Sequence, residues 1–215
     1  MSVASQIQMT RLRAKKPQKR WALVSSGTQY INTGIIASMK TRVVVEYSMP
    51  PTEATMALFG SGVISFGWIF MFFANVSGTL NARSDFGTIQ SEIGRNYLPF
   101  NTRNIVDKNR NKTFVNGELL ADITASFNPI NINLTLFSHS VFEMANFLSS
   151  PFSGAIYRAT IYENDVLIRD FIPVPKGNTD YSTIPAPSNC MWDTVTQTYF
   201  QNAGTGVFGI EEVTP

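Results

Sequence analysis

Residues that could carry catalysis are few in this chain. Its single histidine, His139, lies between Ser138 and Ser140 at the end of an expected strand, a setting typical of a loop or sheet-edge residue rather than a general base. Its single cysteine, Cys190, has no second histidine to activate the thiol, and we expect it to pack beside Trp192 as a small apolar side chain. We therefore predict no catalytic residue and no enzyme activity.

Patterns that bind metals or cofactors are also missing from the sequence. No cluster of histidine and cysteine has the spacing of zinc ligands, and no dense run of aspartate and asparagine suits calcium. No glycine-rich phosphate loop ends in Lys-Ser or Lys-Thr. We predict neither a metal nor a cofactor.

Sugar binding needs simpler chemistry than catalysis: an aromatic ring against the pyranose, with carboxamide and carboxylate groups beside it. The candidates by residue type are Trp68, Trp192, Tyr97, Tyr181, Asn178 and Asp180. Trp68 lies in an apolar run and is expected in the core, whereas the polar loop 176–189 exposes Tyr181. Tyr181, Asn178 and Asp180 are therefore the predicted glycan contacts. The alternative is an ordinary exposed tyrosine without a ligand.

The charge of the chain is asymmetric. Residues 1–45 hold eight of the 17 basic residues and no acid, whereas residues 46–215 hold nine basic and 15 acidic residues. Six basic residues lie where apolar periodicity is absent: Arg11, Arg13, Lys15, Lys16, Lys19 and Arg20. This pattern predicts an extended basic arm on a mildly acidic body. We interpret the arm as an anchor on an acidic protein surface. An inert terminus and a nucleic-acid contact stay open, the latter disfavoured because the body lacks basic and aromatic clusters.

Short strands must position these residues. A chain of 215 residues fits one domain, and 44% hydrophobic with 15% charged residues allows a sizeable core. Alternating and β-branched runs predict strands at 42–47, two within 56–76, and others at 130–137, 153–162, 166–172, 191–193 and 199–200. Asn116-Gly117 predicts a hairpin, because both residues tolerate the positive φ of a type I′ turn. The one helical signal, at 140–148, is a single turn.

No segment has the character of a membrane span or an export signal. The longest apolar run, 63–76, is shorter than the roughly 18 residues that suggest a span. The apolar stretch 21–24 is followed at once by Ser25-Ser26-Gly27, which makes it too short for a signal-peptide core. We expect no membrane association and no export by the usual route.

Several ordered segments resemble a known family. Residues 25–34 (SSGTQYINTG) are similar to the opening of the concanavalin A-like, laminin-G-like jelly-roll domains found in phage structural proteins and in surface proteins of gut bacteria. Later segments are similar too, and they cover most of residues 22–209 with the first: 58–60 (LFG), 114–117 (FVNG), 161–164 (IYEN), 166–173 (VLIRDFIP) and 192–206, which ends in NAGTG.

The resemblance and the strand pattern together predict an all-β, concanavalin A-like (LamG-like) antiparallel jelly-roll β-sandwich with an extended basic N-terminal arm. We divide the chain into the arm (1–20), the sandwich (21–210) and a tail (211–215). Function does not follow from this fold alone, because it hosts lectins, glycosidases and structural modules.

A glycoside hydrolase is the enzymatic alternative that the resemblance raises. Such enzymes hold two carboxylates across the scissile bond, and in one jelly-roll family these lie on a strand as Glu-x-Asp-x-x-Glu. Here Glu163 and Asp165 begin that pattern, but Ile168 ends it, and the segment falls on an expected turn. The sequence therefore disfavours a hydrolase.

The leading hypothesis is a bacteriophage virion structural protein: a capsid decoration, head-fibre or tail-associated module, held by its basic arm and contacting host glycans. Its partners would be capsid or tail proteins and further copies of itself, in a virion assembled in the host cytoplasm. The alternative is a bacterial cell-surface carbohydrate-binding module. The two hypotheses share one expectation, which is that the jelly roll meets a glycan.

Overall fold

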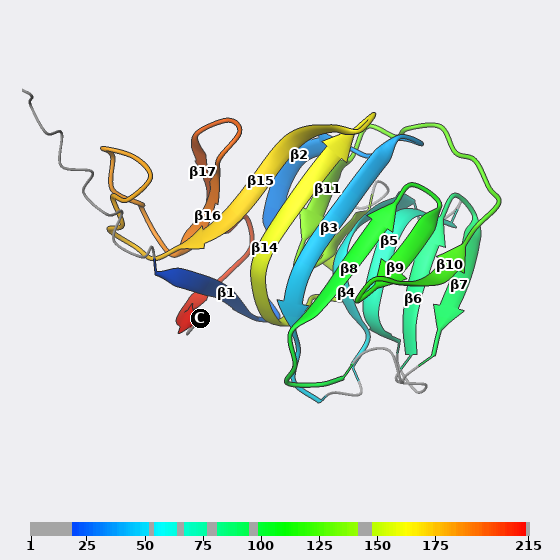
Figure 1. Ribbon diagram of the computed structural model, residues 1–215, viewed down its shortest axis with the longest axis horizontal. Helices are drawn as coiled ribbons and strands as arrows, with labels where there is room; N and C mark the ends of the chain where they lie inside the picture. The colour runs from blue at the N-terminus through cyan, green and yellow to red at the C-terminus, as the bar shows by residue number, and fades with distance from the viewer. Residues whose placement is uncertain are drawn as a thin grey trace, which may run out of the picture.

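The computed structural model describes residues 19–51, 54–63, 67–76, 81–94, 99–141 and 148–213. Within these ranges the chain forms strands and turns only, arranged as two packed sheets (Figure 1). The predicted all-β fold is confirmed. No helix in the described ranges has the length and hydropathy needed to cross a bilayer.

The larger sheet has ten described strands. Eight lie side by side in the order β10-β9-β8-β3-β14-β15-β16-β17, and β1 pairs with both β14 and β18. Their bounds are β1 (Arg20–Ser26), β3 (Thr41–Ser48), β8 (Asn104–Asn109), β9 (Lys112–Val115), β10 (Glu118–Asp122), β14 (Ser153–Glu163), β15 (Val166–Val174), β16 (Cys190–Asp193), β17 (Thr198–Phe200) and β18 (Gly209–Val213).

The smaller sheet has eight described strands. Six follow the order β13-β12-β4-β5-β6-β7, and β11 joins β2 to β4. Their bounds are β2 (Ile31–Ile36), β4 (Met56–Val63), β5 (Gly67–Val76), β6 (Asn81–Phe86), β7 (Ile89–Ile93), β11 (Asn133–Leu136), β12 (His139–Val141) and β13 (Leu148–Ser149). Among the described strands only β12 and β4 run parallel; every other pair is antiparallel.

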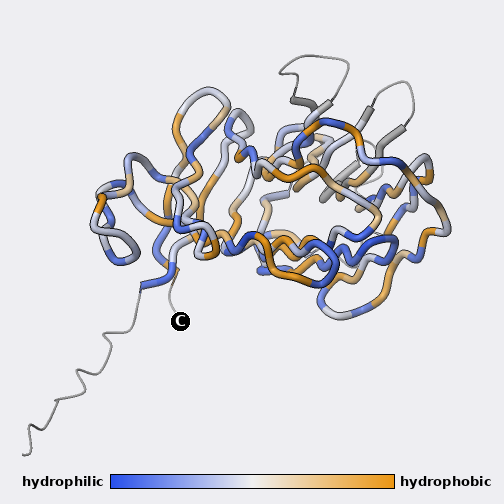
Figure 2. Tube along the Cα trace, turned by 90° about the horizontal axis from the view of Figure 1, so that it is seen from above, coloured by the Kyte–Doolittle hydropathy of each residue, from blue (hydrophilic) through white to orange (hydrophobic). Residues whose placement is uncertain are grey.

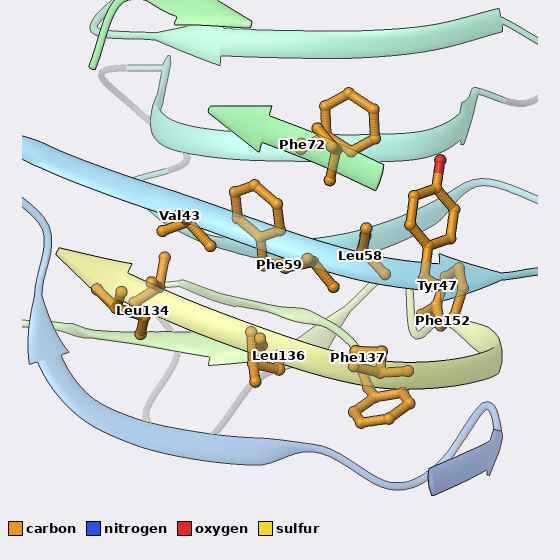
Figure 3. Close-up of a cluster of buried hydrophobic side chains, with 14 of the residues drawn as sticks. Val43, Tyr47, Leu58, Phe59, Phe72, Leu134, Leu136, Phe137 and Phe152 are labelled. Atoms are coloured by element: carbon orange, nitrogen blue, oxygen red, sulfur yellow. The ribbon is translucent and has the colours of Figure 1, made fainter. Parts of the chain in front are cut away.

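The core lies between the two sheets because the strands alternate apolar and polar residues. In β3, every second residue from Thr41 to Tyr47 is buried and the residues between them are partly exposed. Figure 2 shows hydrophobic and hydrophilic stretches interspersed along the trace. Val43 and Tyr47 of β3 face Phe59 of β4 across the core (Figure 3). Aromatic rings fill much of this space, and the Phe59 and Phe72 rings stack at 6.0 Å.

Most strands predicted from the sequence are confirmed, with shifted ends. The strand expected at 130–137 begins only at Asn133, so Ile130 and Ile132 precede β11. The expected helical turn at 140–148 was wrong at both ends, where β12 and β13 lie, and residues 142–147 fall outside the described ranges. The residues assigned to a tail include Glu211 to Val213, which belong to β18 and pair with β1.

Two of the segments that carried the family resemblance lie against each other. Thr28 Oγ1 donates to the carbonyl of Thr205 at 3.1 Å, and the Thr205 amide donates back to the Thr28 carbonyl at 3.1 Å. The Tyr30 amide donates to Asn202 Oδ1 at 3.1 Å. A Cβ on Gly204 would lie 2.3 Å from the Thr28 carbonyl oxygen, so only glycine allows this approach. We call residues 25–30 with 202–207 the clasp.

Candidate functional site

Aromatic side chains lie on the outer face of the larger sheet, which is the face turned away from the core. Phe114 of β9 and Tyr157 and Tyr162 of β14 belong to neither hydrophobic cluster of the described chain. Thr113 and Val115 are buried, so strand alternation turns Phe114 between them outward. Phe114 is partly exposed and is the ring open to a ligand, whereas Arg103 and Arg42 lie over the rings of Tyr157 and Tyr162.

A hollow of about 730 Å³ lies on this outer face, over β3, β8 and β9. It is lined by Val44, Ile105, Asp107, Asn109, Phe114, Asn116 and Gly117. We call it the β3–β8–β9 hollow. Pairing in the ladder brings its members together: Asp107 lies opposite Val44 on one side and Phe114 on the other. Ile105 leaves 45% of its surface exposed, which makes part of the floor apolar and open.

The two asparagines of the β3–β8–β9 hollow differ in whether their side chains already hydrogen-bond within the protein. Asn116 Oδ1 accepts from the Ile105 amide at 2.8 Å, and its Nδ2 donates to Asn104 at 3.0 Å, so this side chain holds the hairpin. Asn116 and Gly117 have φ of 50° and 87°, which confirms the predicted turn. The Asn109 carboxamide, in contrast, makes no hydrogen bond to the described residues. It is the free donor and acceptor of the hollow.

Charged side chains beside the β3–β8–β9 hollow are paired. Arg42 donates to both oxygens of Asp107, at 2.8 Å and 2.7 Å, and its guanidinium lies 5.2 Å from the centre of the Tyr162 ring. The hydrogen bond to Asp107 is the main cause that raises the pKa of Arg42 above its usual value. Of this arrangement, Asp107 lines the hollow, and both of its carboxylate oxygens already accept hydrogen bonds from Arg42.

The predicted glycan contacts lie elsewhere, in the loop between β15 and β16. Asn178 Nδ2 donates to Asp180 Oδ2 at 2.9 Å, and the Asp180 amide donates to Asn178 Oδ1 at 3.0 Å. Tyr181 packs against the cluster around Trp192, and burial raises its pKa. The structure thus brings these three residues together, but it uses the Tyr181 ring partly for packing.

The other aromatic candidates are placed as follows. Trp192 is only 6% exposed and its ring lies 4.7 Å from that of Tyr199. Cys190 packs in the same cluster, as predicted, and burial raises the pKa of its thiol to about 11. Tyr97 and the side chain of Trp68 lie outside the described part of the chain.

Of the six basic residues of the expected arm, the structure describes two. Lys19 Nζ lies 2.8 Å from Glu212 Oε2, and Arg20 is the first residue of β1, opposite Val213. Both therefore adjoin the folded sheet. Arg11, Arg13, Lys15 and Lys16 lie outside the described ranges, and the anchor stays a prediction.

The histidine prediction was wrong about its place. His139 begins β12, which lies between β4 and β13, and it is only 1% exposed. Burial is the main cause that lowers its pKa to about 4, so the imidazole is neutral at pH 7. No group of three or more histidine, cysteine, aspartate or glutamate residues in the described ranges could hold a metal ion.

The two carboxylates of the incomplete hydrolase pattern connect the β14–β15 hairpin to neighbouring segments of the larger sheet. Glu163 accepts from Thr41 Oγ1 at 2.7 Å, and Asp165 pairs with Arg110 at 2.6 Å. Asn164 and Asp165 form the turn between β14 and β15, with φ of 52° and 65°. Both carboxylates therefore already serve the fold.

Comparison with known proteins gives structural likeness only. No protein-family model and no curated protein matches the chain. Among solved structures, a candidate carbohydrate-binding protein from Bacteroides ovatus ATCC 8483 is similar at a TM-score of 0.60 and 12% identity, over 93% of this chain and 62% of that one. The CBM40 of the Ruminococcus gnavus IT-sialidase, bound to α2,3-sialyllactose, is similar at a TM-score of 0.53 and 18% identity, over 70% of this chain and 92% of that one.

A second structure of that CBM40 is similar at a TM-score of 0.50 and 17% identity, over 70% of this chain and 93% of that one. At these identities the likeness concerns the fold. The antiparallel jelly-roll β-sandwich predicted from the sequence is thereby confirmed.

Proposed function

We propose that this protein is a non-catalytic carbohydrate-binding module and that the β3–β8–β9 hollow is its site. The observation that carries the proposal is Phe114, an aromatic ring outside the hydrophobic clusters, beside the free carboxamide of Asn109. A pyranose has an apolar face of C–H groups and a rim of hydroxyls. The Phe114 ring and the Ile105 side chain would contact the apolar face of the sugar. Asn109 would hydrogen-bond to its hydroxyls.

The solved structures favour this class of function over the virion hypothesis. Both proteins named above carry carbohydrate binding in their descriptions, and the Ruminococcus gnavus module holds a sialylated sugar. Nothing observed supports the virion role, the capsid or tail partners, or self-association, and these stay predictions of the sequence. A carbohydrate-binding module is therefore the better supported of the two hypotheses.

The test is a glycan array followed by calorimetric titration of the full chain. Phe114→Ala should weaken binding of the best glycan at least tenfold, about 1.4 kcal/mol, because it removes the stacking ring. Ile105→Ala should weaken binding as well. Its matched control is Ile89→Ala, which removes an equally exposed isoleucine from the smaller sheet, 46% exposed against 45%, and should leave affinity unchanged.

Asp180→Ala tests the site predicted from the sequence. If that variant loses binding while Phe114→Ala keeps it, the glycan binds in the 176–189 loop and the assignment of the hollow is wrong. A blank array for the folded wild-type protein would overturn the proposal of carbohydrate binding itself.

A further inference from the structure

The arginine side chains on the outer face around β3, β8 and β14 each pair with a carboxylate of the protein. Arg42 donates two hydrogen bonds to Asp107 at the edge of the β3–β8–β9 hollow. Farther along the face, Arg158 also donates two hydrogen bonds to Asp170, from Nε at 2.8 Å and from Nη2 at 3.0 Å. Asp170 also accepts from Thr194 Oγ1 at 2.8 Å, which fixes the carboxylate further.

The other two cations of this face follow the same rule. Arg103 Nε lies 2.7 Å from Glu46 Oε1, with its guanidinium 4.4 Å from the centre of the Tyr157 ring. Lys112 Nζ lies 2.7 Å from Asp122 Oδ2. With Arg42 and Arg158, these make four cations, each paired with one carboxylate. On the described strands from β10 to β14, every cation of this face is therefore paired with a carboxylate.

This pairing bears on which sugars the hollow accepts. A sialic acid or a uronic acid carries a carboxylate, which proteins hold best with the fork of a free arginine. Here the Arg42 fork beside the hollow is closed, and Asp107, which lines the hollow, would repel a second carboxylate. A sugar anion would have to displace a protein carboxylate from its arginine. A neutral hydroxyl meets no such obstacle.

We propose that the β3–β8–β9 hollow selects uncharged hexopyranoses and discriminates against sialylated or uronic sugars. The inference rests on the proposed function and adds the ligand class. It separates this chain from the sialyllactose-bound CBM40 that it resembles in fold. Apolar contact from Ile105 and Phe114 and hydrogen bonds from Asn109 would suit a sugar without charge.

The experiment compares matched sugars on the full chain. An array would carry neutral glycans, each beside its α2,3- and α2,6-sialylated form, and the best neutral glycan and its sialylated forms would then be titrated by calorimetry. We expect the neutral form to bind at least tenfold more tightly. We also expect its affinity to change less than twofold between 50 mM and 500 mM salt, because no net charge is neutralised.

Asp107→Asn tests the stated cause, because it frees the Arg42 fork without changing side-chain size. The variant should bind the sialylated form at least fivefold more tightly than wild type does. Glu212→Gln is the control: it also removes one carboxylate charge, and it frees Lys19 beside β1 and β18, away from the hollow, so it should leave the preference unchanged. Thermal unfolding of both variants establishes that each is folded.

The possible results separate the two proposals. Sialylated forms that bind wild type as tightly as, or more tightly than, their neutral partners would overturn the inference while leaving carbohydrate binding intact. An Asp107→Asn variant whose preference matches that of Glu212→Gln would also overturn it. Failure of every glycan to bind folded protein would remove both the inference and the proposed function.

Discussion

At the scale of single residues, the interior of the sandwich holds a lysine. Lys108 of β8 is fully buried, and its Nζ donates to Ser84 Oγ at 2.8 Å while lying 4.9 Å from the centre of the Phe70 ring. The Ser84 and Thr113 hydroxyls are 2.6 Å apart, so these polar groups form one chain. Burial lowers the pKa of Lys108 to about 7, against the smaller opposing effect of Asp85.

The buried lysine predicts a rise of stability with pH. Unfolded lysine keeps its proton up to about 10.5, whereas folded Lys108 loses it near 7. Between these values the unfolded chain binds more protons, so the free energy of unfolding should rise by up to about 1.4 kcal/mol per pH unit. Lys108→Met should remove this rise, measured by urea unfolding at pH 8, 9 and 10.

The exposed Lys112 on the neighbouring strand provides the control for that prediction. Lys112→Met should keep the wild-type pH dependence, because the side chain of Lys112 is 46% exposed and its charge stays hydrated. Equal slopes for wild type and Lys108→Met would show that the lysine does not titrate as its burial implies.

At the scale of elements, β14 organises the larger sheet. Its first half pairs with β1, its second half with β15, and β3 runs along its other edge. Gly154 lies where β1 and β3 converge on it, with φ of 152°. A Cβ there would lie 2.5 Å from the Ser48 carbonyl oxygen and 2.8 Å from the Phe152 ring. The close approach of three strands therefore requires glycine.

Gly154→Ala should lower the free energy of unfolding by about 2 kcal/mol or more, because the new methyl group clashes with backbone and a φ of 152° is unfavourable for a residue with a side chain. The measurement is urea unfolding of wild type and variant. Gly177→Ala is matched to it, since Gly177 also has positive φ, 78°, but no atom lies within 4 Å of its Cβ position. That variant should lose about 1 kcal/mol. Equal losses would mean that the clash contributes nothing.

Strands and hairpins could be predicted from the sequence, and their pairing could not. Alternation from Thr41 to Ser48 shows which side chains face inward, and Asn116-Gly117 specifies a local turn. Neither signal says that β1 lies beside both β14 and β18, because pairing depends on packing between segments far apart in the chain. The buried place of His139 was missed for the same reason.

The candidate site was missed in a similar way. Phe114 stands between buried Thr113 and Val115, so its outward direction was readable once the strand was known. The hollow itself joins Val44 to residues 105–117, and only strand pairing brings them together. The partner of Arg42 was equally invisible, since Asp107 is 65 positions away in sequence. Residue type alone favoured the polar loop instead.

At the scale of the whole molecule, the two candidate sites lie toward opposite ends of the larger sheet. The β3–β8–β9 hollow belongs to the end formed by β10, β9 and β8, and the 176–189 loop connects β15 to β16 at the other end (Figure 1). The clasp and the pairing of β1 with β18 join the first and last described strands. Binding at one candidate site can therefore be distinguished by experiment from binding at the other.

The most direct test of the central claim is an NMR titration of the isotope-labelled protein with the best glycan from the array, following backbone amide shifts. Binding in the β3–β8–β9 hollow predicts that the largest changes fall at residues 105–109 and 114–117, with the 176–189 loop unchanged. Largest changes in that loop, or a saturating titration without shifts over β8 and β9, would contradict the account.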